Sequence, residues 1–386
     1  MYGLVLEGGG AKGSYHVGAY KAILEEGLDI KGVTGTSIGA INGAMIVQGD
    51  FKKCYEIWNN IDYSMIMKES NDEVIRLLDE KIELKDLGIL LNTFNHVISN
   101  RGVDISQFKD ILTELIDEDK IRRSFMDYGL VTFNLTDRKP VEVFKEDIPI
   151  GEMRDYILAS SYLPIFKREK IGGKLYIDGG FYDNLPFKLL ESKGYEKFIL
   201  VRTLASGITK KIDLDEAIIV SPSEDLGSMH KYDHEHTRKN IRLGYYDCIK
   251  AIRGLKGHNY YINPREESEY LKELLSLSHE QISMIQDHMR TPEINNKRIL
   301  FEYIVPKLGH LLDLDKGFSY QDLMLNLLEL RAEAVDIDRY KIYDYEDLKN
   351  LVRSNPLKSK DLNKSLTSFF SKERTLLKIA EIIFCN

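Results

Sequence analysis

The sequence predicts an α/β protein with a parallel sheet covered by helices and an additional helical region at the carboxy-terminal end. Two patterns support this prediction. Short apolar segments alternate with helical segments along the first part of the chain, as parallel α/β folds require. After about residue 232 the strand signals nearly stop and helical patterns take over. The chain of 386 residues, with 43% hydrophobic and 30% charged residues, is long enough for one large domain or two ordinary ones.

The first four elements alternate between strand and helix. Residues 2–7 (YGLVLE) form an apolar run typical of a buried strand, and residues 14–26 are expected to be a helix. A short second strand is predicted at residues 30–35 (IKGVTG), followed by a helix rich in small residues at 36–49. Because a helix connects each strand to the next, the strands are expected to be parallel.

The remaining elements follow the same reasoning. Residues 51–125 are expected to be mostly helical, because 51–61 and 104–116 place apolar residues at i, i+3 and i+4. Further strands are predicted at 128–136, 139–144, 174–178, 197–204 and 216–222, and further helices at 267–277, 295–312 and 365–384. We divide the chain near residue 265 into an α/β domain (1–264) and a helical region (265–386). No linker marks this boundary, so the late helices are equally compatible with covering the sheet.

Composition excludes several classes of function. The formal net charge of −8 argues against general binding of nucleic acid. The three cysteines, Cys54, Cys248 and Cys385, are far apart and match no zinc spacing, which suits a reducing compartment. No leader sequence precedes the first strand, and no apolar run approaches the roughly 18–20 residues of a membrane span. We therefore expect a cytoplasmic protein without a metal or cofactor, which contacts a lipid membrane peripherally if it acts on lipid.

A glycine loop, GGGAKG (8–13), follows the first strand and leads into a helix. Such bare backbone suits a phosphate, a dinucleotide or a transient oxyanion. The P-loop motif needs its lysine after the last glycine, whereas Lys12 precedes Gly13. The spacing also satisfies G-x-G-x-x-G, but Asp29, the acidic residue near the required distance, precedes the second strand instead of following it. Both nucleotide interpretations are therefore disfavoured.

The oxyanion interpretation rests on the end of the second strand, GTSIG (35–39), which is a G-x-S-x-G motif followed by a helix. In this context the serine lies on a sharp turn with its hydroxyl exposed above the sheet. Glycines are required two positions before and after it, because side chains there would collide. Ser37 is thus a candidate nucleophile, and the N–H groups of the glycine loop, at the same carboxyl edge, are candidate oxyanion donors.

An aspartate is the best candidate for the base. None of the nine histidines is predicted in a loop at the carboxyl edge; His16 lies in the first turns of a helix and is expected to be structural. Asp178 ends a predicted strand and is followed by Gly179 and Gly180, which leave room beside it. An Asp-Gly pair is equally typical of a simple turn, so both interpretations stay open on this loop alone. Nearby Asp183 is expected to anchor the loop.

The segments GGGAKG (8–13), GTSIG (35–39) and DGG (178–180), in this order, resemble the patatin-like phospholipases, and ASSYLPIFK (159–167) is similar to a segment that this family carries before its aspartate. The resemblance implies a three-layer α/β/α fold and calcium-independent hydrolysis of phospholipid or lysophospholipid esters by a Ser–Asp dyad. By position, Ser37 would be the nucleophile and Asp178 the base. The remaining site residues that it implies are the oxyanion loop (Gly8, Gly9, Gly10, Ala11, Lys12, Gly13), the elbow (Gly35, Thr36, Ile38, Gly39) and the base loop (Gly179, Gly180). Lys12 stands where the family often has arginine.

Two segments are candidates for contact with lipid. Residues 230–258 carry seven Lys or Arg against three Asp or Glu, a reversal of the overall charge, although a packed helix with solvated basic residues explains them as well. The last predicted helix, 365–384, has an apolar face that is expected to pack inward. Alternatives to the phospholipase hypothesis are a general serine esterase or thioesterase and a catalytically idle lipid-binding regulatory module. No feature of the sequence specifies the oligomeric state.

Overall fold

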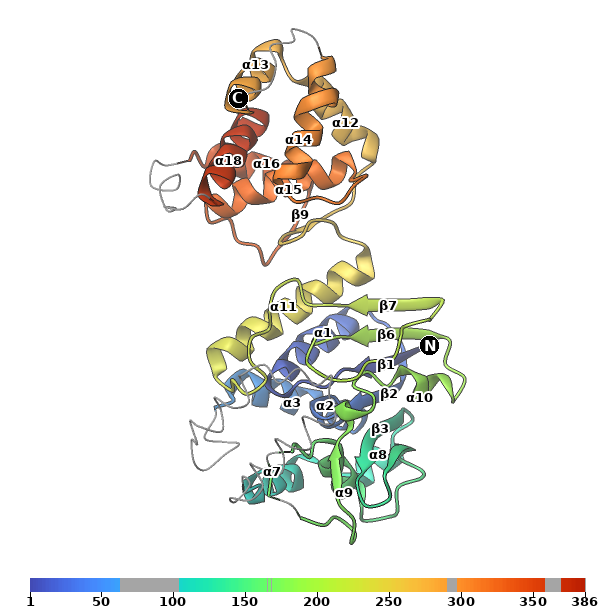
Figure 1. Ribbon diagram of the computed structural model, residues 1–386. Coiled ribbons are helices and arrows are strands. Elements are labelled where there is room, and N and C mark those ends of the chain that lie inside the picture. Colours follow the sequence, from blue (N-terminus) through green and yellow to red (C-terminus); the bar gives the residue numbers. More distant parts are fainter. Residues whose placement is uncertain (63–103, 165, 168, 290–296, 358–368, 386) are drawn as a thin grey trace. The chain divides into compact units, whose positions relative to one another are not determined.

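The computed structural model describes residues 1–62, 104–164, 166–167, 169–289, 297–357 and 369–385 (Figure 1). Its contacts divide the chain into two compact units, Met1–Ile252 and Arg253–Asn386. The first unit confirms the α/β architecture predicted from the sequence. The second unit confirms the predicted change to a mainly helical structure. The domain boundary near residue 265 remains a prediction, since the two units are defined only by their internal contacts. Part of the helical segment predicted at 51–125 lies outside the described residues.

The first unit is built on a seven-stranded sheet in the order β4-β3-β2-β1-β6-β7, with β5 paired to β3. The pairs from β3 to β7 along this order are parallel, whereas β4 and β5 run antiparallel to β3. The strands are β1 (Tyr2–Leu6), β2 (Ile30–Thr36), β3 (Asp127–Asn134), β4 (Lys139–Phe144), β5 (Tyr176–Asp178), β6 (Lys197–Val201) and β7 (Glu216–Val220). The central strands are buried on both faces, which explains their continuous apolar sequence.

Helices cover both faces of this sheet. On one face α2 packs closely, since a Cβ at its Gly43 would lie 3.1 Å from Val33 of β2. On the other face α10 contributes Phe187 and Leu190 to an apolar cluster with Val5 of β1. In the described ranges, the helices of this unit are α1 (Ser14–Glu25), α2 (Ile38–Val47), α3 (Phe51–Asn60), α7 (Ser106–Leu115), α8 (Glu118–Arg123), α9 (Met153–Ser160), α10 (Phe187–Glu191) and α11 (His234–Arg253). The first unit is therefore a three-layer α/β/α structure.

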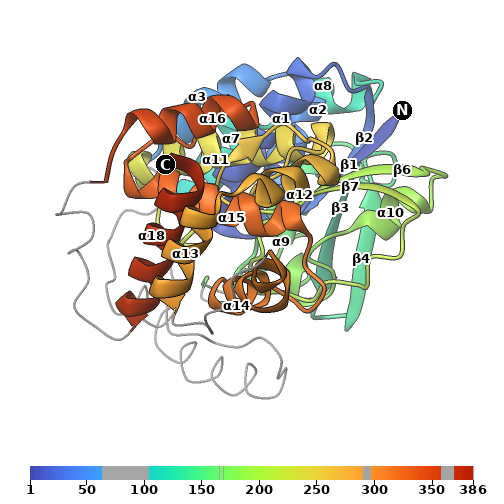
Figure 2. The same cartoon turned by 90° about the horizontal axis from the view of Figure 1, so that it is seen from above.

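The basic segment is mostly the long helix α11, which packs against α1 (Figure 1 and Figure 2). Glycines allow the two helices to approach closely: a Cβ at Gly18 of α1 would lie 1.9 Å from the Ile241 carbonyl oxygen, and one at Gly244 would lie 2.1 Å from that of Tyr15. Several basic groups of α11 are engaged within the unit. Arg238 donates to the Asn59 carbonyl, and Lys239 pairs with Glu224. The packed-helix interpretation of this segment is thus supported by the structure.

Strand β3 carries two strands end to end on one edge. Because β4 pairs along the other edge from Gly129 to Asn134, β2 and β5 share the remaining edge. The last residue of β2, Thr36, pairs with Val131, and the last residue of β5, Asp178, pairs with Thr132. Asp178 ends a strand as predicted, but this strand, β5, is short and antiparallel to β3, so it is not one of the parallel strands that the helical connections of the first elements suggest. Neighbouring positions of β3 nevertheless bring the two strand ends together.

The second unit has a core of its own, formed by buried apolar residues between Tyr260 and Phe384. Its elements are β8 (Tyr261–Ile262), α12 (Glu267–Ser276), α13 (His279–Met289), the π-helical turn η3 (Leu300–Ile304), α14 (Val305–Leu311), α15 (Tyr320–Ala334), β9 (Ile342–Tyr343), α16 (Tyr345–Ser354) and α18 (Phe369–Cys385). In α18, the side chains of Leu377, Ala380 and Phe384 are buried, as the inward-packing interpretation predicts. None of the helices in the described ranges is long and apolar enough to cross a bilayer.

Candidate active site

Ser37 lies at a strained turn between β2 and α2. Its backbone has φ 56° and ψ −125°, a left-handed conformation that is uncommon outside glycine. The turn is so tight that a Cβ at Gly35 would lie 2.2 Å from the carbonyl carbon of Gly39, and one at Gly39 would lie 2.2 Å from the Leu6 carbonyl oxygen. Both glycines of the GTSIG motif are thus required by sterics, and the side chain of Ser37 is presented at the carboxyl edge of the sheet.

The glycine loop leaves β1 at the same edge, beside the elbow, because Leu6 pairs with Gly35. It continues through a 3₁₀ turn, η1 (Gly10–Gly13), into α1. Gly9 has φ 151° and Gly10 has φ 55°, and a Cβ at Gly10 would lie 2.3 Å from the Met229 carbonyl oxygen. Only glycine satisfies these positions without strain.

The six predicted oxyanion residues are not equivalent, because several of their N–H groups already have acceptors. The N–H of Gly8 donates to the Asn184 carbonyl at 3.1 Å and that of Ala11 to the Met229 carbonyl at 2.7 Å. The N–H of Lys12 donates to the Gly9 carbonyl at 3.1 Å. For the N–H groups of Gly9 and Gly10, the described part of the chain provides no hydrogen-bond acceptor. These two amides are the donors that remain for a substrate oxygen.

Asp178 lies at the end of β5 and caps the 3₁₀ turn η2 (Gly179–Phe181). Its Oδ1 accepts a hydrogen bond from the Gly180 N–H at 2.8 Å, and its own N–H donates to the Tyr162 carbonyl at 2.9 Å. Gly179 must be glycine here, because a Cβ would lie 2.1 Å from the Val131 carbonyl oxygen. The carboxyl group is thus held in place through Oδ1, whereas Oδ2 is buried and has no hydrogen-bond partner of standard geometry in the described structure.

The electrostatic environment of Asp178 differs from that of an ordinary turn aspartate. Burial raises the pKa of its carboxyl group to about 6, and the neighbouring Ser37 hydroxyl and the Gly180 N–H, which donates to Oδ1, oppose this rise. The Ser37 hydroxyl is therefore close enough to lower the pKa of the carboxyl group, although it does not form a hydrogen bond of standard geometry with Oδ2. A carboxylate with a raised pKa beside a hydroxyl is suited to accept its proton.

A residue that the sequence did not single out, Ser160, ties the backbone of Ser37 to strand β3. The Ser160 hydroxyl accepts a hydrogen bond from the Ser37 N–H at 3.0 Å and donates one to the Val131 carbonyl at 2.7 Å. The same carbonyl oxygen leaves no room for a side chain at Gly179, because a Cβ there would lie 2.1 Å from it. Ser160 is fully buried at the end of α9, within the ASSYLP segment. A serine among small residues before a proline was the only signal, and it does not reveal a contact 123 residues away.

The other polar residues near these loops have structural partners. Asp183 is buried and pairs with Lys210 at 2.9 Å, which agrees with an anchoring role. His16 is fully buried, and burial lowers its pKa to about 3, so it stays neutral over the usual pH range. Its Nδ1 lies 3.3 Å from the Asn42 side-chain nitrogen. Among the described residues, no three His, Cys, Asp or Glu side chains gather as a metal site would require.

A family model and several relatives match this chain, and their descriptions agree with one another. The family model described as patatin-like phospholipase matches residues 4–190. The neuropathy target esterase sws of Drosophila melanogaster is 24% identical over 68% of this chain and 17% of its own length. Lysophospholipase NTE1 of Eremothecium gossypii is 27% identical over 69% of this chain and 16% of its own length. The chain therefore corresponds to only a small part of these relatives. VipD from Legionella pneumophila has a TM-score of 0.42 and 14% identity, covering 99% of this chain and 91% of VipD.

Proposed function

Residues 4–190 belong to the patatin-like phospholipase family, and from this premise we propose that the protein is a lipid acyl hydrolase of the phospholipase A or lysophospholipase type. Ser37 is the nucleophile, Asp178 the general base, and the N–H groups of Gly9 and Gly10 are the oxyanion donors. The relatives named as a lysophospholipase and an esterase support an acyl ester as substrate. Contact with a membrane is peripheral in this proposal, and no cofactor takes part.

The reaction follows from the positions of these groups. Asp178 accepts the hydroxyl proton of Ser37 while Oγ attacks the ester carbonyl carbon. The negative charge on the carbonyl oxygen is stabilised by the N–H groups of Gly9 and Gly10. When the intermediate collapses, the ester C–O bond breaks and Asp178 gives its proton to the leaving alcohol. A water molecule then transfers a proton to Asp178 and attacks the acyl group, which leaves as a fatty acid while Ser37 regains its proton.

One observation carries the proposal: the ends of β2 and β5 meet on adjacent residues of β3, so that the strained Ser37 faces a buried carboxyl group with a raised pKa. A turn aspartate without a catalytic role would gain nothing from such burial, because desolvation disfavours its charged form. The two free amides of the glycine loop lie beside the same elbow. Together these features support acyl transfer through a serine ester.

The test compares Ser37→Ala and Asp178→Asn with the unmodified protein on a lysophospholipid, a diacyl phospholipid and a short-chain nitrophenyl ester. Each variant is expected to lose hydrolysis by at least about a thousandfold, as removal of a nucleophile or its base does in other serine hydrolases. Circular dichroism checks that the variants remain folded. Ser161→Ala is the control, because this serine near the elbow has a buried hydroxyl with no partner within the described structure. Full activity of the Ser37→Ala protein would refute the assignment.

Substrate comparison separates the alternatives. A lipid hydrolase should prefer the lysophospholipid or phospholipid over the nitrophenyl ester, whereas a general esterase or thioesterase should not. A fluorophosphonate probe should label Ser37 in an active enzyme but not in an idle lipid-binding module. Mass spectrometry of the products from a mixed lipid extract then identifies the acyl chain and headgroup released.

A further inference from the structure

A loop at the carboxyl edge of the sheet, residues 202–209, is bonded directly to both catalytic loops; we call it the rim loop. Its Thr203 hydroxyl donates to the Gly8 carbonyl, and the Leu204 N–H donates to the Glu7 carboxylate at 2.9 Å. On its far side, the Ile208 N–H donates to the Gly180 carbonyl at 2.9 Å. The rim loop is therefore attached to the glycine loop at one end and to the base loop at the other.

Two large aliphatic side chains of the rim loop face solvent. Leu204 is 53% exposed and Ile208 is 46% exposed. Single exposed aliphatic residues are ordinary, but these two lie on backbone that hydrogen bonds hold in place. Leu204 also has φ 50°, a left-handed conformation that suits Asn or Gly far better than Leu. Neither fold stability nor local backbone preference explains a leucine at this position.

Arg202 of the rim loop and Lys210, which follows it, are both paired with carboxylates. Arg202 pairs with the buried Glu7 at 3.0 Å, and Lys210 pairs with Asp183 at 2.9 Å and with Glu142 at 3.1 Å. A surface that recognises an anionic partner would keep such cations unpaired. The exposed side chains Leu204 and Ile208 of the rim loop therefore offer apolar surface, while Arg202 and Lys210 are already paired.

We propose that Leu204 and Ile208 insert into the apolar layer of a lipid surface and bring the acyl ester to the dyad. The proposal rests on the proposed function, because a lipid partner is inferred from the substrate class of the adjacent site. It differs from the electrostatic interpretation of residues 230–258, since binding through the rim loop depends on aliphatic burial and is insensitive to salt. Zwitterionic vesicles should then suffice.

Flotation with phosphatidylcholine vesicles tests the proposal on the full chain carrying Ser37→Ala, which prevents hydrolysis. The test variant adds Leu204→Asn and Ile208→Ser; asparagine tolerates the left-handed backbone, so folding is preserved, and thermal unfolding checks this. The matched control adds Phe125→Ser and Ile150→Ser instead. Both of these are strongly exposed, and Phe125 precedes β3 at the opposite, amino edge of the sheet.

The rim variant is expected to lower vesicle partitioning by at least about tenfold, which corresponds to about 1.4 kcal/mol, while the control variant partitions normally. Partitioning should also be the same in dilute buffer and in about 1 M salt. Unchanged binding of the rim variant, an equal loss in the control, or release of the protein by salt would each overturn the proposal. Loss of the proposed function would appear separately, as failure of the unmodified protein to hydrolyse any ester.

Discussion

A single hydroxyl, that of Ser160, is expected to set the position of the nucleophile. It accepts a hydrogen bond from the Ser37 N–H and donates one to the Val131 carbonyl, and the same carbonyl lies close to Gly179, next to the proposed base Asp178. Ser160→Ala removes the group that ties the elbow to β3. A displacement of about 1 Å at a reacting group costs on the order of a hundredfold in rate, so we expect kcat to fall by about ten- to a hundredfold while KM changes little.

The neighbouring Ser161 provides the control for Ser160. Its hydroxyl is buried without a partner among the described residues, so Ser161→Ala should leave kcat unchanged and be neutral or slightly stabilising. Both variants are measured well below their unfolding temperatures, with steady-state kinetics on a short-chain ester. If the two alanine variants show the same kcat, Ser160 only fills space and does not position the nucleophile.

The raised pKa of Asp178 predicts the acid limb of the activity profile. In the proposed mechanism the carboxyl group must be ionised to accept the Ser37 proton, and burial raises its pKa to about 6. The value of kcat/KM is therefore expected to be constant above about pH 7 and to fall about tenfold for each pH unit below about 6. Steady-state rates between pH 4 and 8 check this, with far-UV circular dichroism at each pH. A profile that stays flat down to pH 5 would exclude Asp178 as the base.

The same shift makes Asp178 a source of instability. An aspartate in the unfolded chain has a pKa of about 3.9, so between pH 4 and 6 the native state binds a proton that the unfolded state has lost. Stability from this group is highest below pH 4 and decreases as the pH rises to about 6. Asp178→Asn removes the buried charge and should add about 3 kcal/mol at pH 8 and little at pH 4, as urea unfolding at both pH values can measure.

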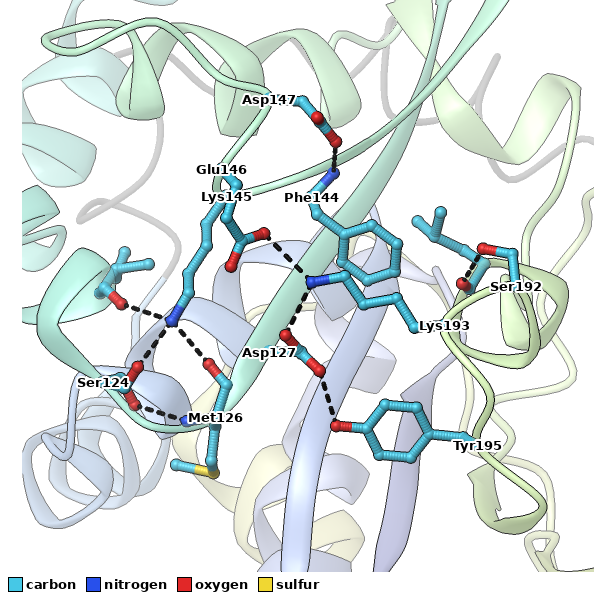
Figure 3. Close-up of polar contacts among 12 residues, drawn as sticks. Ser124, Met126, Asp127, Phe144, Lys145, Glu146, Asp147, Ser192, Lys193 and Tyr195 are labelled. Atoms are coloured by element: carbon cyan, nitrogen blue, oxygen red, sulfur yellow. Dashed lines mark hydrogen bonds and ion pairs between the residues drawn. The ribbon is translucent and has the colours of Figure 1, made fainter.

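At the scale of elements, Lys145 is expected to fasten β4 to the end of α8. Its ammonium group donates to the carbonyls of Ile121, Ser124 and Met126 at 2.7–3.3 Å, and burial lowers its pKa. Figure 3 shows the contacts with Ser124 and Met126. Lys145→Met keeps an unbranched side chain of similar length but removes the ammonium group, so that buried carbonyl groups are left without a donor. We expect this to reduce the free energy of unfolding by about 2–3 kcal/mol.

Lys193, in the same view, is the matched control for Lys145. It pairs with the carboxylates of Asp127 at 2.7 Å and Glu146 at 3.2 Å, and all three side chains are partly exposed (Figure 3). Exposed ion pairs of this kind contribute about 1 kcal/mol or less, so Lys193→Met should change the free energy of unfolding by no more than that. Equal losses in the two variants, measured by urea unfolding, would show that burial of Lys145 is not what matters.

Much of the element order and the site segments could be predicted from periodicity and motifs, whereas contacts between distant segments could not. The antiparallel pairing of β5 depends on where β2 stops along β3, and no local pattern records this. The strand predicted at 197–204 ends earlier, at Val201, because the Glu7 carboxylate takes the N–H groups of Thr203 and Leu204. The role of Ser160 could not be predicted for the same reason, because its partner Ser37 is 123 residues away in the sequence.

At the scale of the whole molecule, the two units have separate cores and only the first contains the proposed site. The core of the second unit is formed by residues from Tyr260 to Phe384, including the fully buried Leu328 of α15. Since a core leucine replaced by alanine typically loses about 2–5 kcal/mol, Leu328→Ala should destabilise the second unit strongly. Its effect should stay local, because each unit is held together mainly by its own contacts.

Scanning calorimetry of the full chain tests this independence. Leu328→Ala should lower the temperature of one unfolding transition and leave the other in place, and hydrolysis of a short-chain ester below that transition should be unchanged. The matched variant in the first unit is Leu200→Ala, in the fully buried strand β6, which should shift the other transition. If Leu328→Ala lowers ester hydrolysis at a temperature where both units are folded, the second unit shapes the site, and the reaction cannot be explained from residues 1–252 alone.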